Sequence, residues 1–345
     1  MSRHFSIRTI GLIAVAVLML VGIFRSNAQA AALGHYAPAV LNIRDYFLPE
    51  EGYYYAQYMP YYHTSTFHDP SGDKVDSIKI NPGPGPGVTV PVDAKFNMIV
   101  FAPVLMASTD LKILGARYGA FINPTMANSN LSGTLTTRTL GALNVNETNY
   151  AWGDMYVQPI WLLWSLPHFD IDLAEGFYAP VGKYDTTNVT FLSKSITVPS
   201  SSNVGMGFWT NQVQTGAAWY PFDNKGTAVA AALTWEVNTK MKNVDLTPGQ
   251  RLTVNWGASQ YLPVTKDQSR LIEVGLTGYD QWQVTNDTGS DANNVNDQIH
   301  AVGGQIGYTI VPSSAAINFR YLHEYSARDR FMGDWYSVSF AVKAF

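Results

Sequence analysis

The chain contains no cysteine, and only 14% of its 345 residues are charged, against roughly 25% in an ordinary soluble domain. The lack of cysteine excludes disulfide scaffolds, thiolate metal sites and cysteine nucleophiles. Long uncharged runs are scarce too, since a mean hydropathy of −0.04 is too polar for a bundle of membrane helices. Disorder is also excluded, because 20 Tyr, 16 Phe and 9 Trp supply more apolar surface than a chain without a core carries.

The N-terminus has the pattern of an export signal. Arg3 and Arg8 flank the start, an apolar run covers residues 10–24, and small residues at positions 28–30 suit a signal peptidase. We therefore expect residues 1–30 to be a cleaved signal peptide. An uncleaved anchor is the alternative, although the apolar run is short for a bilayer span. Removal of this basic segment leaves an acidic mature chain, so no binding of nucleic acid is predicted.

Apolar and polar residues alternate in about twelve runs after residue 50. In one of them Val229, Leu233 and Trp235 share one face, while Thr234 and Glu236 lie on the other. This period of two is typical of a strand, because a helix repeats its apolar positions at three and four residues. Each run is close to the roughly 9–11 residues with which a tilted strand crosses a bilayer.

The composition of the two faces distinguishes two all-β architectures. The polar face of a soluble sandwich meets water and is rich in charge. Here that face is mostly Gly, Ala, Ser, Thr and Asn, which suits a narrow lumen, whereas the apolar face suits lipid. Aromatic residues near the strand ends suit the two interfaces, namely Trp235, Trp256, Tyr308 and Tyr336.

In hydrocarbon every backbone polar group must pair within the protein, so a β protein spans a membrane only as a closed barrel. We therefore predict an all-β fold, a transmembrane antiparallel β-barrel of about 12 strands, with 14 as the alternative. The barrel is expected over residues 52–345, in the bacterial outer membrane. Residues 31–51 are expected to form an N-terminal extension, either a plug in the lumen or a periplasmic tail.

Polar segments separate the predicted strands. Residues 123–147, 184–203 and 284–297 are expected to be long external loops, and residues 223–226 a short periplasmic turn. Such an asymmetry between the two ends is typical of outer-membrane barrels.

Nine charged residues fall on positions of lumen parity, and we predict that they line the pore. A bare charge in a narrow lumen is costly unless it is paired or hydrated. Two interpretations stay open: the charges form a polar ladder that sets pore width and field, or they pair to fill a blocked barrel. The nine predicted pore-lining residues are Arg117, Asp170, Asp172, Glu236, Lys240, Arg251, Glu273, Arg320 and Glu324.

Catalytic and metal-binding patterns are weak. No Gly-x-Ser-x-Gly motif of a serine hydrolase occurs. His300 and His323 fall on strands whose parity points them outward or to a rim. The spacing of His63 and His68 suits neither one strand face nor one helix face. We therefore expect no enzyme activity, no catalytic residue, no metal and no cofactor.

Several short segments resemble one known family, the outer-membrane proteins associated with the meta-cleavage pathway of phenol degradation. Each segment is short, but their order over most of the mature chain is specific. They are Gly34-His35-Tyr36, Leu48-Pro49, Gly52-Tyr53, Gly153-Asp154, Gln158-Pro159, the Pro-x-Gly-x-Tyr turn from Pro180 to Tyr184, and Gly205, Gly207 and Trp209. The resemblance implies a barrel of about twelve strands that is a channel for small hydrophobic or aromatic compounds.

The combined expectation is a monomeric channel, surrounded by outer-membrane lipid, through which a small hydrophobic or aromatic solute passes without a chemical step. Three alternatives stay open: a secreted, soluble all-β binding protein, an outer-membrane lipase, and a purely structural barrel.

Overall fold

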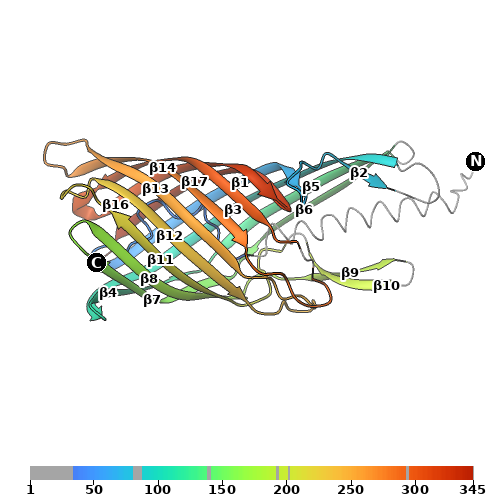
Figure 1. The fold of residues 1–345 in the computed structure, drawn as a ribbon, viewed down its shortest axis with the longest axis horizontal. Coiled ribbons are helices and arrows are strands. Elements are labelled where there is room, and N and C mark those ends of the chain that lie inside the picture. Colours follow the sequence, from blue (N-terminus) through green and yellow to red (C-terminus); the bar gives the residue numbers. More distant parts are fainter. Residues whose placement is uncertain are drawn as a thin grey trace, which may run out of the picture.

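The computed structural model describes residues 34–80, 88–137, 141–191, 194–200, 203–292 and 295–344. The predicted signal peptide lies outside these residues. Figure 1 shows a long barrel of tilted strands, from which further strands project at one end. Within the described ranges, no helix has the length and apolar character of a membrane span.

The strands follow one another along the chain with short or medium connections, and a single 3-10 turn occurs at Val311–Ser313. The strands are β1 Gly52–His68, β2 Ser77–Ile80, β3 Val88–Ile113, β4 Ala116–Asn123, β5 Met126–Thr137, β6 Gly141–Trp152, β7 Met155–Ser165, β8 Phe169–Ala179, β9 Thr186–Phe191, β10 Lys194–Pro199, β11 Thr210–Trp219, β12 Thr227–Asn238, β13 Arg251–Pro263, β14 Arg270–Gln283, β15 Gln298–Ile310, β16 Ala315–Arg328 and β17 Arg330–Lys343.

The described strands close into a ring of twelve. The last strand, β17, pairs with β1, and β1 also pairs with β3, so the barrel has no open seam there. From β3 the ring continues through β4, β7, β8 and β11 and then in chain order to β17. All pairs are antiparallel, and closure gives the backbone groups their partners. The predicted antiparallel barrel of about 12 strands is confirmed.

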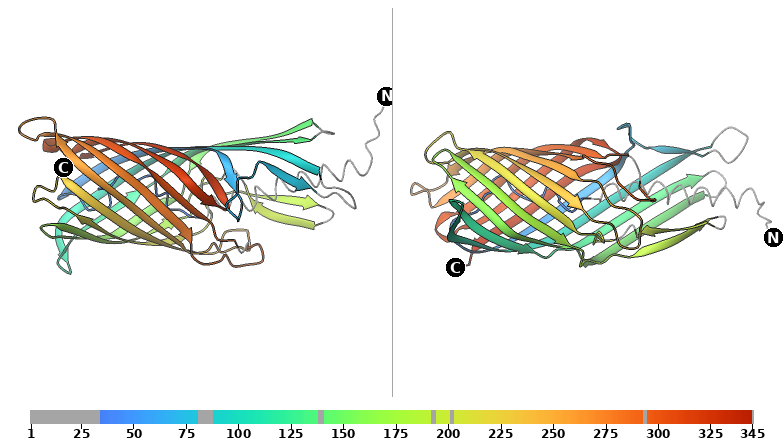
Figure 2. Two further views of the ribbon diagram at one scale, coloured as in Figure 1. Left: turned by 45° about the horizontal axis from the view of Figure 1, so that its top comes forward. Right: turned by 60° about the horizontal axis from the view of Figure 1, so that its bottom comes forward.

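Hairpins lengthen the wall at one end, as Figure 2 shows. The strand β2 pairs with the start of β3, and β5, which continues the line of β4, pairs with β3 and β6, whereas β9 and β10 pair only with each other in the described sheets. The predictions of loops over residues 123–147 and 184–203 are therefore wrong. The error has a physical reason: no lipid demands an apolar face there, so the period-two signal is weak, yet threonine-rich segments still favour strands.

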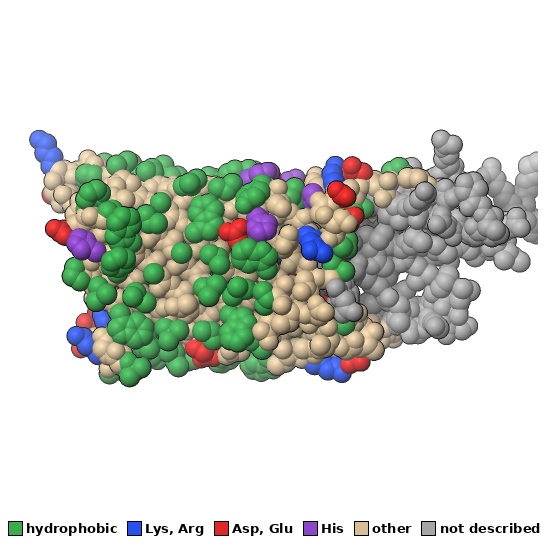
Figure 3. Space-filling model, in the orientation of Figure 1, with side chains coloured by type: hydrophobic (Ala, Val, Ile, Leu, Met, Phe, Trp, Pro, Cys, Tyr) green, Lys and Arg blue, Asp and Glu red, His purple; other side chains and the backbone are tan. Residues whose placement is uncertain are grey.

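The side-chain alternation places apolar rows on the outside. On β12, Leu233 and Trp235 are exposed while Thr234 and Glu236 are fully buried. Figure 3 shows hydrophobic side chains spread over the outer wall. Short turns gather at one end of the barrel, such as the pair Leu114 and Gly115, both with positive φ. Short turns mark the periplasmic end, and the fold is that of a bacterial outer-membrane barrel.

Candidate functional site

The segment of residues 34–50 lies inside the barrel and runs along most of it. Gly34 lies against Arg251 at the outer end, and the carbonyl of Leu48 accepts a hydrogen bond from Arg117 near the periplasmic end. This segment is neither helix nor strand. Its backbone groups therefore need partners on the barrel wall.

The polar wall formed by β11 to β17 supplies these partners. Glu236 Oε1 accepts the backbone N–H groups of His35 and Tyr36, each at 2.9 Å. Farther along the same wall, Arg320 of β16 donates to the carbonyl of Leu41. Bonds of this kind offset the cost of burying both the ions and the irregular backbone.

Arg44 binds the segment to the barrel wall near the periplasmic turns. Its Nε lies 2.9 Å from Glu273 Oε1, and its two terminal nitrogens donate to the carbonyls of Lys225 and Gly226. The guanidinium also lies over the ring of Tyr261, 4.1 Å from the centroid. The alternation of apolar and polar residues along the strands could not identify Arg44 as a functional residue, because Arg44 precedes β1.

The nine predicted pore-lining residues have different surroundings. Five contact the segment of residues 34–50: Arg117, Glu236, Glu273 and Arg320 through hydrogen bonds, and Arg251, which also binds Asp297, by lying against Gly34. Three others face inward and bind side chains of the wall or its turns: Asp170 binds Tyr220 and Lys225, Asp172 binds Gln214, and Glu324 binds Tyr62, Tyr279 and Trp335.

Lys240 has a different place from the other eight. It follows the end of β12 and its Nζ lies 2.5 Å from Asp245 Oδ1 in the outer loop. Strand parity does not extend past the last ladder pair, so counting along β12 misplaced this side chain. Hydrogen bonds from Lys240 and from Ser290, which lies in the loop between β14 and β15, lower the pKa of Asp245.

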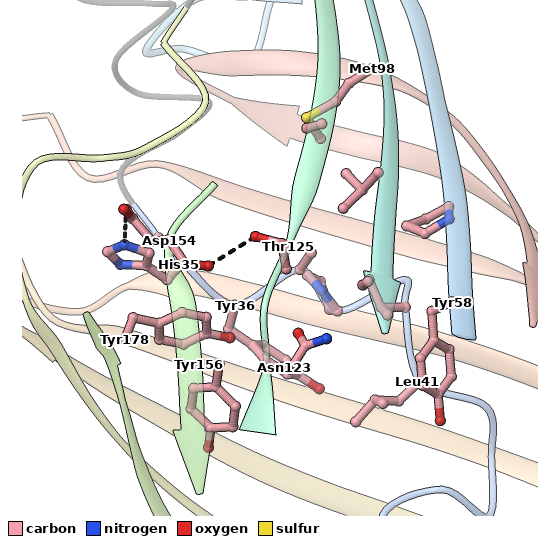
Figure 4. Close-up of a pocket in the computed structure, with 18 of the residues that line it drawn as sticks. His35, Tyr36, Leu41, Tyr58, Met98, Asn123, Thr125, Asp154, Tyr156 and Tyr178 are labelled. Atoms are coloured by element: carbon pink, nitrogen blue, oxygen red, sulfur yellow. Dashed lines mark hydrogen bonds and ion pairs between the residues drawn. The ribbon is translucent and has the colours of Figure 1, made fainter. Parts of the chain in front are cut away.

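Asp154 joins the segment to the wall, at the break between β6 and β7 (Figure 4). Its Oδ2 lies 2.9 Å from His35 Nε2 and accepts the N–H of Met206 at 2.7 Å. Its Oδ1 accepts the N–H of Gly182 at 2.9 Å, and its carbonyl accepts the hydroxyl of Thr125. One carboxylate thus holds the N-terminal segment and two outer loops together.

Three glycines permit this close packing around Asp154. A Cβ on Gly182 would lie 2.6 Å from the carbonyl carbon of Gly153, and a Cβ on Gly205 would lie 2.8 Å from that of Gly182. A real Cβ atom does not approach a non-bonded carbon atom this closely. Segments that are far apart in the sequence and carry the family resemblance therefore meet at one point.

A cavity of about 330 Å³ lies between the N-terminal segment and the wall formed by β1, β3, β4, β5 and β7. Unlike the wall that binds the segment, this side is apolar. Alternate residues of β3 face the cavity: Phe96, Met98, Val100, Ala102, Val104 and Met106. Because Phe101 and Leu105 are exposed on the outer face, β3 is apolar on both faces, and a polar lumen row was the wrong expectation for this strand.

The histidines outside the lumen pair with polar groups. His300 Nδ1 lies 2.6 Å from Asp280 Oδ1, and His323 Nδ1 lies 2.9 Å from Asp334 Oδ1, both on the outer wall. His63 contacts Asn97 in the same way. Among the described residues, no three His, Cys, Asp or Glu side chains form a group that could hold a metal ion.

One solved structure shares the fold of this chain. The crystal structure of the COG4313 outer membrane channel from Pseudomonas putida F1 is similar, with a TM-score of 0.56 and 12% identity over 88% of this chain and 99% of that chain. The β domain of the Bordetella autotransporter BrkA has a TM-score of 0.44 and 9% identity over 85% of this chain and 99% of that chain. No curated protein matches the chain.

The family assignment rests on a match over most of the chain. A family model described as "Putative MetA-pathway of phenol degradation" matches residues 80–340. This match covers most of the chain and spans the barrel from β3 to β17. The protein therefore belongs to this family of the phenol-degradation pathway, as the short segments around Asp154 indicated.

Proposed function

We propose that the protein is an outer-membrane channel for small hydrophobic compounds, which cross by diffusion without a chemical step, and that residues 34–50 are its plug. This proposal rests on the division of the lumen into two halves. The polar half binds the plug, and the apolar half, lined by β3, leaves a cavity beside it. Apolar cavities of this size, at the lower end of the usual range of about 300–1,000 Å³, suit one small ligand.

The periplasmic half of the plug closes the passage below the cavity. Ile43, Tyr46, Phe47 and Leu48 pack with Trp161 and other wall residues in one apolar cluster. A solute in the cavity must therefore displace these side chains before it leaves. The side chains of the cluster contact one another by packing, so an apolar solute can replace some of these contacts as it moves past, while the hydrogen bonds of Arg44 and Arg117 hold this half of the plug on the wall.

The two outward histidines engage aspartates on the lipid-facing side of the wall, whereas Tyr279 and Trp335, next to these aspartates in the strands, point to the opposite side and line the cavity. We expect the barrel to work as a monomer, since the cavity, plug and outer loops all come from one chain.

A matched pair of variants on β3 tests the proposed path. Ala102 is buried and lines the cavity, whereas Ala107 lies on the opposite face of the same strand. Phenylalanine at position 102 fills the cavity, and phenylalanine at position 107 meets lipid. We expect Ala102→Phe to lower the uptake of a radiolabelled apolar solute by cells, and Ala107→Phe to leave it unchanged. Equal uptake by the two variants would contradict the proposal.

A further inference from the structure

A row of polar side chains crosses the lipid-facing side of the barrel. This histidine row runs over six neighbouring strands, from β3 through β1, β17, β16 and β15 to β14. Its members are Asn97, His63, Asp334, His323, His300 and Asp280. We propose that the histidine row binds a glycolipid of the outer leaflet, one whose sugars carry free hydroxyl groups and amide-linked acyl chains. Such binding does not depend on what passes through the lumen.

The histidine row is continuous because neighbouring members are opposite one another across the strands. His63 is the register partner of Asn97 on β3 and of Asp334 on β17. Asp334 is in turn the partner of His323 on β16. The last two members form a direct pair between β15 and β14, two residues nearer the outer end of β15. Opposite side chains on one face lie about 5 Å apart, so the polar groups form one line.

The histidine row lies at the outer edge of the apolar band. Its members on β1 and on β14 to β17 are two to five residues from the outer ends of their strands. Figure 3 shows histidine and acidic side chains near the place where the hydrophobic side chains of the wall end. The ring of Trp282 lies 5.5 Å from that of His300, and the ring of Tyr61 lies 6.4 Å from that of Tyr336. Aromatic residues mark the headgroup level in such barrels, where the sugars of a glycolipid join its acyl chains.

Each histidine of the row is held through one ring nitrogen. Nδ1 of His300 lies 2.6 Å from Asp280 Oδ1. Nδ1 of His323 lies 2.9 Å from Asp334 Oδ1. The ring of His63 contacts the amide oxygen of its partner on β3 in the same way, at 2.6 Å. Because carboxylate and amide oxygens accept, the hydrogen of each neutral ring is on Nδ1, and the three Nε2 atoms are acceptors.

Donors of the wall are already used by the two carboxylates. Trp256 Nε1 donates to Asp280 Oδ2 at 3.0 Å. The hydroxyl of Tyr321 donates to Asp334 Oδ1 at 2.8 Å. Asn97 adds the donors of its amide nitrogen at the β3 end. A molecule bound along the rest of the row must therefore supply hydrogen-bond donors to the imidazoles and carboxylates.

A hydroxylated, amide-bearing lipid meets this requirement better than an ordinary phospholipid. Sugar hydroxyl groups and amide N–H groups donate, whereas a phosphodiester accepts, and the carboxylates of Asp280 and Asp334 repel its charge. Without donors, the row is polar surface at the edge of hydrocarbon, which costs free energy. The outer face of β12 shows that the wall can be apolar instead, since Val229, Leu233 and Trp235 are exposed there.

The length of the histidine row favours lipid over a second copy of this chain as its partner. The row occupies six of the twelve strands in the ring, so it extends around about half of the barrel. Two barrels are both convex and touch along a few strands only. Lipid molecules follow the curvature of the wall, so they can cover the whole row.

Lipid A is the probe, because its sugars carry free hydroxyl groups and amide-linked acyl chains. Phosphatidylcholine is the comparison, because its headgroup has no hydrogen-bond donor. The detergent-purified full chain is titrated with each lipid, and native mass spectrometry counts the bound molecules. We expect lipid A to bind at a concentration at least about tenfold lower than phosphatidylcholine, as two or more hydrogen bonds give. Equal binding of the two lipids would overturn the proposal.

The double variant His63→Phe with His323→Phe removes two acceptors and keeps rings that suit the interface. His168→Phe, at an exposed histidine in the periplasmic turn between β7 and β8, is the matched control. We expect the double variant to bind lipid A at least about fivefold more weakly, and the control to bind it as the wild type does. If the double variant yields no folded barrel, His323→Phe alone takes its place, with about a two- to tenfold loss. Unchanged affinity in a folded variant would overturn the proposal.

Thermal unfolding separates a lipid site from a purely structural role of the histidines. In phosphatidylcholine vesicles, we expect the double variant to unfold at or above the wild-type temperature, because polar groups have left the edge of the apolar band. Added lipid A should raise the unfolding temperature of the wild type more than that of the variant. The same loss of stability in both lipids would show that the histidines act within the wall. A wild-type dimer that the variant does not form would show that a second copy covers the row. Either result would overturn the proposal.

Discussion

At the scale of single residues, two carboxylates inside the lumen receive donors from the plug and the outer loops. Glu236 receives two backbone N–H groups of the plug, and Asp154 receives Gly182, Met206 and His35. Burying a carboxylate is costly unless such donors surround it. These contacts are therefore placed to hold the plug in one position.

The carboxylate of Asp154 is expected to keep the plug attached to the outer loops. Asp154→Asn leaves the size unchanged and removes the charge, which weakens hydrogen bonds worth about 1.5–3 kcal/mol each. We expect openings of the channel in planar bilayers to become about tenfold more frequent or more. Asp185→Asn, at an exposed carboxylate in the neighbouring loop, is the control and should open as the wild type does. Unchanged opening in Asp154→Asn would show that the junction does not hold the plug.

A charge on the outer wall is expected to destabilise the barrel according to its depth. Leu233 lies near the middle of β12 and is exposed outward, so Leu233→Arg should lower the free energy of unfolding by about 2–4 kcal/mol. Val264→Arg, in the periplasmic turn after β13, should cost about 0–1 kcal/mol. Urea unfolding in lipid vesicles measures both. Equal costs at the two positions would contradict the assigned membrane depth.

At the scale of elements, the plug and β3 form the two sides of the passage. The plug makes directional bonds with the polar strands, as Asn42 Nδ2 does with Ser339 Oγ at 2.9 Å. On β3 the lumen row from Phe96 to Met106 has no such donors or acceptors, and the next residue of the row, Ser108, donates to the carbonyl of Pro49. A solute therefore finds its freest space along β3.

The plug is expected to move during transport. Because the chain has no cysteine, the variant Asn42→Cys with Ser339→Cys can be joined by a short, reducible thiol cross-linker. We expect the cross-linked barrel to take up apolar solutes several-fold more slowly and the reduced barrel to recover. Each single-cysteine variant treated with the same reagent is the control. Full uptake with the cross-link in place would mean that the solute passes a fixed plug.

The outer loops between β12 and β13 and between β14 and β15 are expected to separate in acid. Asp245 joins them, since its carboxylate bonds to Lys240 and to the N–H of Ser290. These bonds lower the pKa of Asp245 below its unfolded value of about 3.9. Its contribution is therefore complete above that pH and is lost as the pH falls through the lowered pKa.

Spin-label mobility at Asn286→Cys measures this separation, because Asn286 is exposed in the second loop. We expect the label to become more mobile below about pH 4 in the otherwise wild-type chain. In Asp245→Asn the label should be mobile already at pH 7 and respond little to acid. A label that is equally immobile in both chains at pH 7 would contradict the role of Asp245.

At the scale of the whole molecule, the period-two pattern predicted the barrel because lipid requires an apolar outer face and most strands also have a polar lumen face. That constraint ends where the membrane ends, so the hairpin of β5 and β6 was taken for a loop. Lumen parity found Glu236 and Arg320 because both lie on regular strands. It missed His35, Arg44 and Asp154, which lie before β1 or at the break between β6 and β7. Of these three, His35 and Asp154 lie in the short segments that resemble the family.

The apolar lumen row of β3 could not be predicted from alternation, since a strand that is apolar on both faces resembles a buried core strand. Only the pairing of β3 with β1 and β4 in the closed ring shows that one of its faces meets lipid and the other the cavity. This same row carries the proposed passage for solutes.

The most direct test labels two neighbouring residues of β3 in the cysteine-free chain. Val100→Cys places a thiol on the cavity side, and Ile99→Cys places one on the lipid-facing side of the same strand. Both variants react with N-phenylmaleimide, and the uptake of an apolar solute is measured before and after the reaction. We expect the reaction to block uptake in Val100→Cys and to leave it unchanged in Ile99→Cys. Uptake that persists in fully labelled Val100→Cys would contradict a passage along β3.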